Sequence, residues 1–250
     1  MKTEDLREAA RIFAAAERSS VPIQSLPPRA RPSSFLDAAA IQVETVKMLG
    51  ERAAGYKVAG ANTDSVMWGI VLASRLLESG ARMPATMVPM LGIEAEIAFR
   101  VDADIPEHEA SWTAEAFNSI VTALPAIEVV ATRFASYDDT PRLDRAADFM
   151  SNGALICGEP QPDWDRFDLS SIAVTLSIGE KAVETVGGHP TNDPRIPALA
   201  FLNAAGRPAI PRGTIITTGA YAKLPARPGD LVEATFGSFG RVSVSLGGRD

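Results

Sequence analysis

The sequence predicts an α+β protein in which a helical N-terminal arm precedes a strand-rich body. Two segments within the first fifty residues carry helical signals, whereas the second half of the chain consists of short apolar stretches separated by glycine and proline turns. A succession of short strands of this kind is typical of a β-sandwich or a rolled sheet. We therefore expect a helical arm over residues 1–50 and a strand-rich body, either a β-sandwich or a rolled sheet, over residues 51–250.

The arm consists of two predicted helices and an extended linker. Residues 3–17 place apolar side chains at helical spacing, and Thr3 is the expected N-cap. Residues 19–34 contain four prolines, which favour extended chain. Residues 34–48 are again rich in helix-forming residues. Neither helix carries obvious chemistry, so we expect the arm to pack on the body or on another subunit.

The body is expected to be built mainly from strands, with three further helices. Strands are predicted at 55–59, 88–101, 126–134, 154–158 and 214–219, and as hairpins at 172–178 with 181–186 and at 231–236 with 241–246. Helices are predicted at 112–124, 142–150 and 197–203. Residues 69–77 are apolar, and their pattern favours neither strand nor helix.

The predicted strand over residues 88–101 places two carboxylates on one face. Its apolar face consists of Ile93, Ala95, Ile97, Phe99 and Val101. Glu94, Glu96 and Ala98 lie on the opposite face, with the two glutamates roughly 7 Å apart at their Cα atoms. Carboxylates so placed repel each other, and a hard divalent cation with oxygen ligands removes that repulsion. The alternative is a solvated strand face with two ordinary surface glutamates.

Two further charged residues interrupt apolar strands. Glu128 lies in a buried-type strand, where an isolated carboxylate needs a partner. It is the natural third member of a carboxylate cluster, and an ion pair with an arginine such as Arg133 is the alternative. Lys57, between Tyr56 and Val58, either extends its amine to the surface or is partly buried with an altered pKa.

The composition excludes several classes of protein. The formal net charge is −7 and no basic stripe occurs, so nucleic acid is not an expected partner. One cysteine and two histidines exclude a disulfide framework and a cysteine- or histidine-rich metal site. No apolar run approaches the roughly 18 residues of a membrane span, and the charged N-terminus lacks a signal-peptide core. We expect a cytoplasmic protein with no membrane partner.

Seven short segments follow one another in a characteristic order. They are Gly55–Lys57, Trp68–Gly69, Ile93–Ile97, Leu124–Val129, Ala147–Asp148, Gly188–Pro190 and Ile215–Gly219, the last followed by Pro228–Asp230. Together they resemble the 2-keto-4-pentenoate hydratase / 2-oxo-3-hexenedioate decarboxylase family of the fumarylacetoacetate hydrolase superfamily. The resemblance covers nearly the whole chain. It implies a fumarylacetoacetate hydrolase-like rolled mixed β-sandwich with a helical N-terminal arm, a homo-oligomer, and a Mg²⁺ or Mn²⁺ cofactor.

The resemblance also implies roles for individual residues. Glu94, Glu96 and Glu128 match the metal ligands, and Lys57 matches the active-site lysine. The remaining matches are Asp148, a polar residue near the pocket that is assigned to catalysis, and the substrate-binding residues Thr218, Gly219 and Trp68.

The implied activity is that of a metal-dependent lyase acting on small 2-oxo or 2-hydroxydienoic acids in aromatic catabolism. In a 2-keto-4-pentenoate hydratase-like reaction, the metal stabilises an enolate, Lys57 moves the C3 proton and water adds at C4. The alternatives are a decarboxylase of 4-oxalocrotonate type, an acylpyruvate C–C hydrolase and a non-catalytic partner subunit. A hydrolase would need a base that activates water, and His108 and His189 are the only histidines.

Three departures from the family pattern fall near the expected pocket. The loop at 60–67 is shorter by about eight residues than is usual for the family, and Ser74 stands where an aspartate is usual. The loop before Gly188–Pro190 is also short, so a family serine near residues 186–187 has no counterpart. We expect the two shortened segments, at 60–67 and 186–188, to border the metal pocket. The pocket would then be open to solvent or covered by a neighbouring subunit, with residues 3–17 as the expected cover.

Overall fold

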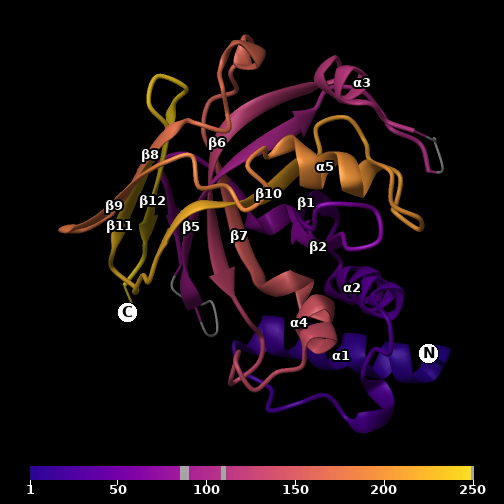
Figure 1. Ribbon diagram of the computed structural model, residues 1–250. Coiled ribbons are helices and arrows are strands. Elements are labelled where there is room, and N and C mark those ends of the chain that lie inside the picture. The colour runs from indigo at the N-terminus through magenta and orange to yellow at the C-terminus, as the bar shows by residue number, and fades with distance from the viewer. Residues whose placement is uncertain (85–89, 108–110, 249–250) are drawn as a thin grey trace.

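Two β-sheets and a set of short helices make up the computed structural model, which describes residues 1–84, 90–107 and 111–248 (Figure 1). The helices of the described chain are α1 (Thr3–Ser19), α2 (Phe35–Leu49), α3 (Ala114–Asn118), α4 (Arg142–Ala147) and α5 (Arg195–Leu202), with 3₁₀ turns η1 (Pro28–Ala30), η2 (Ala73–Arg75), η3 (Phe149–Ser151) and η4 (Trp164–Arg166). No helix among these residues is long and apolar enough to cross a membrane.

The larger sheet has seven strands in the order β2-β1-β10-β5-β6-β7-β3. Its strands are β1 (Ala53–Ala59), β2 (Met67–Leu72), β3 (Leu76–Glu78), β5 (Met90–Val101), β6 (Val121–Ala131), β7 (Asn152–Cys157) and β10 (Ile215–Leu224). Only η2 separates β2 from β3, yet these two strands form the opposite edges of the sheet, and β2 also contacts β7. The sheet must therefore curl until its edges meet, which gives it an inner and an outer face.

The smaller sheet packs on the outer face. Its order is β4-β12-β11-β8-β9, built from β4 (Ala81–Met83), β8 (Ala173–Ile178), β9 (Lys181–Val186), β11 (Leu231–Thr235) and β12 (Arg241–Leu246). The main apolar core includes Ile93, Ile97 and Phe99 of β5 together with Leu176 of β8 and Val244 of β12. The predicted rolled β-sandwich is thus confirmed.

The inner face of the rolled sheet holds a second, smaller apolar cluster. It consists of Val71, Ala98, Leu124, Ala126, Leu155 and Ile215. Ala98 lies on the same face of β5 as Glu94 and Glu96, so the alternation predicted for this strand is confirmed from Met90 onward, whereas residues 88 and 89 lie outside the described residues. The apolar cluster fills the roll at the level of Ala98, and the two glutamates occupy the part where β1 ends and β7 begins.

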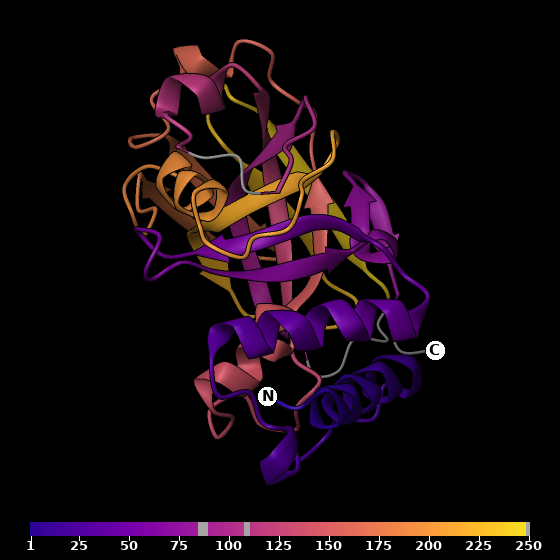
Figure 2. The same ribbon diagram turned by 90° about the vertical axis from the view of Figure 1, so that its right-hand side faces the viewer.

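The N-terminal arm packs on the body near this end of the roll (Figures 1 and 2). Phe13 of α1 meets Phe134 edge-on with ring centroids 5.6 Å apart, inside a buried cluster shared with α2 and α4. Gln42 of α2 is buried, and its amide donates to the carbonyls of Trp68 and Ala146 and accepts from the Ile70 amide. The arm is therefore joined to β2 and α4 by specific hydrogen bonds as well as by apolar contact.

Both predicted helices of the arm are confirmed, but the predicted cap, Thr3, is wrong. Ser34 caps α2, because its hydroxyl accepts from the Asp37 amide at 3.1 Å. Thr3 does not cap α1, whose N-cap position is Lys2 and carries no side-chain cap bond. The linker between the helices is extended except for the η1 turn at Pro28–Ala30.

The helix predicted at 112–124 is wrong. Only α3 is helical there, and β6 starts at Val121 and continues through Pro125. Both faces of β6 are buried, so its apolar residues follow one another without the alternation that marks a half-exposed strand. Pro125 has no backbone N–H to donate, and β6 tolerates it because its position lies just beyond the paired part of the β6–β7 ladder, which ends at Cys157. The Pro125 carbonyl still accepts a hydrogen bond from the Gly158 amide.

The other segments follow the predictions more closely. Residues 69–77, for which no element was favoured, contain most of β2, the η2 turn and the start of β3. The helix predicted at 142–150 ends at Ala147 and is followed by η3, in which Phe149, Met150 and Ser151 all have positive φ angles. The two hairpins and the helix near 197–203 are confirmed.

The seam where the roll closes depends on Gly69. A Cβ at this position would lie 2.2 Å from the Phe149 carbonyl oxygen and 2.5 Å from its carbon. We expect Gly69→Ala to lower the free energy of unfolding by about 1–3 kcal/mol, because the backbone must shift to admit the methyl group. Urea unfolding of the variant measures this, with Gly248→Ala as the matched control since no atom lies within 4 Å of its added Cβ. Equal losses in the two variants would contradict the assignment.

Candidate active site

Three carboxylates and one amine converge on the inner face of the roll. Glu94 and Glu96 come from β5 and Glu128 from β6, where it is paired in register with Glu94, and one oxygen from each carboxylate lies within 4.8 Å of the others. Lys57 of β1 places its Nζ 3.0 Å from Glu128 Oε1 and 3.8 Å from Glu94 Oε2. The structure thus brings together the four residues that the sequence analysis grouped as metal ligands and active-site lysine.

The cluster is largely removed from water. Glu96 and Glu128 are fully buried, and the side chains of Lys57 and Glu94 are 15% and 23% exposed. Among the described residues, Glu96 Oε1 and Glu128 Oε2 have no hydrogen-bond partner. Buried polar atoms are normally satisfied, so two orphaned oxygens within one carboxylate cluster fit a divalent cation with oxygen ligands.

Burial dominates the electrostatics of the cluster. It raises the pKa of Glu96 and places the pKa of Glu128 well above its usual range; neighbouring glutamates add to both effects and Lys57 opposes them. For Lys57, burial disfavours the charged amine, but the surrounding carboxylates, Glu128 foremost, outweigh it and raise the pKa. The site is therefore an electronegative pocket that attracts cations.

Glu96 is oriented by strand β10. Its Oε2 accepts from the Thr217 hydroxyl and, at 3.1 Å, from the Gly219 amide. Gly219 has a φ of 125°, a conformation that favours glycine, and it lies within the irregular part of the β5–β10 ladder. The Gly219 amide therefore belongs to the site through its backbone.

Thr217, and not Thr218, points toward the carboxylates. Thr217 pairs with Lys57 in the parallel β1–β10 ladder and so shares its face. Thr218 is buried, its hydroxyl lies 3.4 Å from the Ile97 carbonyl, and its own carbonyl contacts His189. The sequence analysis missed Thr217 because a Thr-Thr pair does not indicate which member faces inward, and only the register with Lys57 settles it.

Asn152, at the start of β7, is a second residue that the sequence analysis did not assign to the site. Its side-chain amide donates to Glu128 Oε1 at 2.9 Å. The preceding η3 turn holds three residues at positive φ, a costly conformation for side-chain-bearing residues that the surrounding packing must maintain. This turn fixes the direction in which Asn152 enters the roll.

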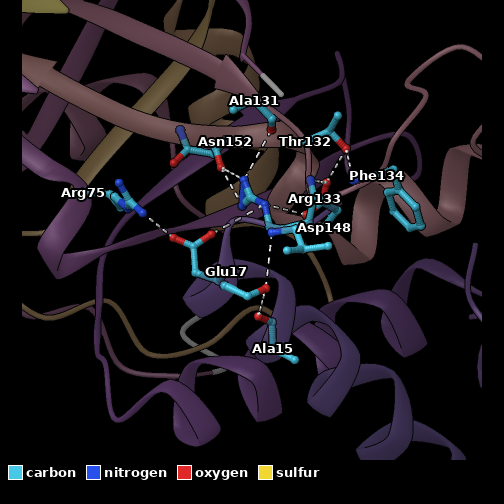
Figure 3. A network of polar contacts seen from close by, with 11 residues as sticks. Ala15, Glu17, Arg75, Ala131, Thr132, Arg133, Phe134, Asp148 and Asn152 are labelled. Carbon is cyan, nitrogen blue, oxygen red and sulfur yellow. Dashed lines mark hydrogen bonds and ion pairs between the residues drawn. The ribbon is translucent and has the colours of Figure 1, made fainter. Parts of the chain in front are cut away.

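Arg133 binds the backbone carbonyl of Asn152 (Figure 3). Its guanidinium donates twice to the Asn152 carbonyl, at 3.0 and 2.6 Å, and pairs with Asp148 at 3.0 Å. Glu17 of α1 lies 3.7 Å from Arg133 and 2.6 Å from Arg75. The alternative predicted for Glu128, an ion pair with Arg133, is replaced by its pair with Lys57, and a chain of polar contacts connects the N-terminal arm to Glu128.

Asp148 and Trp68 do not join the carboxylate cluster. Asp148 is fully buried and accepts from the Thr132 hydroxyl at 2.6 Å and from the Arg133 amide at 2.9 Å. Trp68 pairs with Val58, next to Lys57 in β1, and therefore lies on the outer face of the sheet, where it packs on Phe35 and Phe201. Asp148 thus reaches Glu128 only through Arg133 and Asn152, whereas Trp68 belongs to the core.

Both ring nitrogens of His189 form hydrogen bonds. Nδ1 accepts from the Thr191 amide at 3.3 Å, so Nε2 carries the proton and donates to the Thr218 carbonyl at 3.1 Å. Burial lowers the pKa of His189 to about 4. These contacts favour a structural role, and the other histidine, residue 108, lies outside the described residues.

The two shortened segments lie at different distances from the cluster. His189, which directly follows the segment at 186–188, lies close to Gly219, because a Cβ on Gly219 would lie 3.3 Å from His189 Nε2. That the segment itself borders the metal pocket stays a prediction. The loop at 60–66 leaves β1 at the carboxylate end of the roll, and its residues 63–66 line a cavity of about 530 Å³ with α2 and α4. That the loop borders the metal pocket stays a prediction.

Comparisons with known proteins agree with this geometry. No family model matches the chain. It is 24% identical to the TodF product hydratase of Pseudomonas putida, over 98% of this chain and 96% of the relative. It is 25% identical to the 2-oxo-hept-4-ene-1,7-dioate hydratase of Escherichia coli, over 83% and 85%. These relatives confirm the resemblance to 2-keto-4-pentenoate hydratases that the sequence motifs indicated.

Solved structures confirm the fold. The 4-oxalocrotonate decarboxylase from Pseudomonas putida G7, complexed with magnesium and adipate, superposes with a TM-score of 0.84 at 20% identity and 98% coverage of both chains. A fumarylpyruvate hydrolase from Pseudomonas aeruginosa, in complex with Mn²⁺ and pyruvate, gives a TM-score of 0.55 at 12% identity, over 79% of this chain and 90% of the other. The chain has the fold of the fumarylacetoacetate hydrolase superfamily.

The contact between Asn152 and Glu128 generates a first prediction for the site. Asn152→Ala should weaken Mg²⁺ binding about tenfold or more, because the hydrogen bond that orients Glu128 is lost. Calorimetric titration with Mg²⁺ measures the affinity. Ser151→Ala is the matched control, since the neighbouring buried hydroxyl has no hydrogen-bond partner. Equal affinity in Asn152→Ala and wild type would remove Asn152 from the site.

The buried His189 generates a prediction for pH dependence. Its folded-state pKa of about 4 lies below the unfolded value of 6.5, so between these values only the unfolded state binds the proton. The free energy of unfolding should therefore fall as the pH is lowered from about 6.5 to 4. In His189→Gln this His-dependent part of the slope should be absent, and unfolding curves across the range test it. An identical slope in the variant would contradict the assignment.

Proposed function

We propose that the protein is a divalent-metal-dependent lyase acting on small 2-oxo or 2-hydroxydienoic acids, most simply a hydratase of 2-keto-4-pentenoate type. The observation that carries this proposal is the Lys57 amine beside three carboxylates, two of which have orphaned buried oxygens. The similarity of the chain to two hydratases, over most of their length, supports the same reaction class.

The carboxylates are assigned to the metal. Glu94, Glu96 and Glu128 would hold Mg²⁺ or Mn²⁺, and solved structures with this fold are complexed with one or the other ion. When bound, the ion supplies Lewis-acid polarisation of the substrate's carboxylate and 2-oxo group. Thr217 and the Gly219 amide orient Glu96, and Asn152 orients Glu128, so that the remaining oxygens face a common point.

Lys57 is assigned to proton transfer. Its Nζ is the one cationic group in contact with the cluster among the described residues, and it reaches the inner face from β1, beside the carboxylates. From there it can give a proton to C3 of the bound acid or remove one, the step that hydration and decarboxylation share. Asp148 acts through Arg133 and Asn152 as a positioning residue.

The hydratase reaction is favoured over C–C bond hydrolysis. Hydrolysis needs a base that activates water, and His189, the one histidine among the described residues, has both ring nitrogens in hydrogen bonds. A decarboxylase of 4-oxalocrotonate type remains the second candidate, because a protein of that name shares the fold over 98% of both chains. The family resemblance further supports a homo-oligomer and a cytoplasmic location. Light scattering tests the oligomeric state directly.

Lys57→Met tests the proposed reaction. The variant should lose exchange of the C3 protons of a 2-oxo acid with D₂O by at least 100-fold, because the side chain keeps its apolar length and loses the amine. Proton NMR measures the exchange, and calorimetry should show that Mg²⁺ still binds. Lys47→Met, which removes an exposed lysine of α2, is the control. Exchange at the wild-type rate in Lys57→Met would remove Lys57 from the mechanism.

A further inference from the structure

A cavity of about 490 Å³ begins at one of the proposed metal ligands. Glu94 forms part of its wall, together with Val130 of β6, the β10 residues Lys223 and Leu224, and Tyr137 and Asp138 of the loop that follows β6. Glu94 also belongs to the carboxylate cluster. The cavity therefore adjoins the site at a shared side chain.

Lys223 faces the cavity from the strand next to Glu94. The two residues are paired in the antiparallel β5–β10 ladder, so their side chains emerge on the same face with Cβ atoms about 5 Å apart. Lys223 is exposed and, among the described residues, is the one cation in the cavity wall. No ion pair connects it to a described carboxylate within 4.0 Å, so its amine is available to a ligand.

The rest of the wall suits a short hydrocarbon chain. Leu91, Val130, Leu224 and Pro225 supply apolar surface between Glu94 and the solvent. A 2-oxo acid whose head group lies at the carboxylate cluster would extend its chain along this surface. The far end of that chain would then come within reach of the flexible Lys223 side chain.

Lys223 is the group of the wall that can pair with an anionic end. With a divalent cation and the C1 carboxylate of the ligand bound, the three glutamates and Lys57 sum to a formal charge of −1, so a distal carboxylate gains from its direct contact with Lys223 and not from the net charge of the cluster. Asp138 is the other charged residue of the wall besides Glu94 and Lys223, and it is exposed to water. An additional carboxylate on the ligand can therefore pair with Lys223 in a charge-assisted hydrogen bond.

We propose that Lys223 binds the distal carboxylate of a short 2-oxo dicarboxylic acid and makes the site selective for dicarboxylates over monocarboxylates. This inference rests on the proposed function for the position of the 2-oxo acid head group. The residues of the cavity wall thus determine which 2-oxo acids bind, and the proton transfer at C3 is the same for all of them.

Calorimetric titration of the Mg²⁺-loaded protein with 2-oxoadipate and with 2-oxohexanoate tests the proposal. These ligands have the same chain length and differ in the distal carboxylate. Wild type should bind 2-oxoadipate about tenfold more tightly, as expected for one charge-assisted hydrogen bond. Lys223→Met should abolish most of this ratio, whereas Lys223→Arg should retain it. Lys181→Met removes an exposed strand lysine of β9, outside the cavity wall, and should match wild type.

Two results would overturn the proposal. One is a wild-type protein that binds the two ligands equally, and the other is a Lys223→Met variant whose ratio equals that of wild type. Both are measured by binding, without turnover. Failure of the proposed function would instead appear as a wild-type protein that binds the 2-oxo acids but exchanges no C3 protons, so the two failures are distinguishable.

Discussion

The burial of like charges inside a rolled sheet is the constraint on which this structure depends. Glu96 and Glu128 are fully buried beside Glu94, and Lys57 neutralises one of the three carboxylates. Uncompensated buried charge costs several kcal/mol per ion, so the fold carries this cluster at the expense of its own stability. The formal charge that remains is −2, which matches one divalent cation. A site that is unfavourable when empty is thus suited to bind a metal ion.

The rolled sheet is what makes the cluster possible. β1, β10, β5 and β6 are neighbours, and their register places Lys57, Thr217, Glu96 and Glu128 on one concave face. The outer face carries the main apolar core and the second sheet, which supply the stability that the inner face lacks. The N-terminal arm reaches the same end of the roll, where Glu17 and Arg133 extend the polar contacts of the site into α1.

Much of this was predictable from local pattern. Alternation along β5 indicated the shared face of Glu94 and Glu96, and the apolar context of Glu128 indicated that it needed a partner. What failed depends on tertiary contacts. The end of the segment predicted as a helix at 112–124 is strand β6, whose two buried faces hide the alternation of a half-exposed strand. Thr217, and not Thr218, faces the site because it pairs with Lys57. Asn152 reaches Glu128 because a left-handed turn precedes it, and the sequence gives no sign of that turn.

A crystal structure of the protein with Mn²⁺ and oxalate tests the central claim most directly, because anomalous scattering identifies the position of the ion by its own signal. The account predicts one strong anomalous peak on the inner face of the roll. Oxygens of Glu94, Glu96 and Glu128 should lie about 2.0–2.3 Å from it, with oxalate completing the coordination. A peak elsewhere, or an ion bound at this site without one of the three glutamates, would contradict the account.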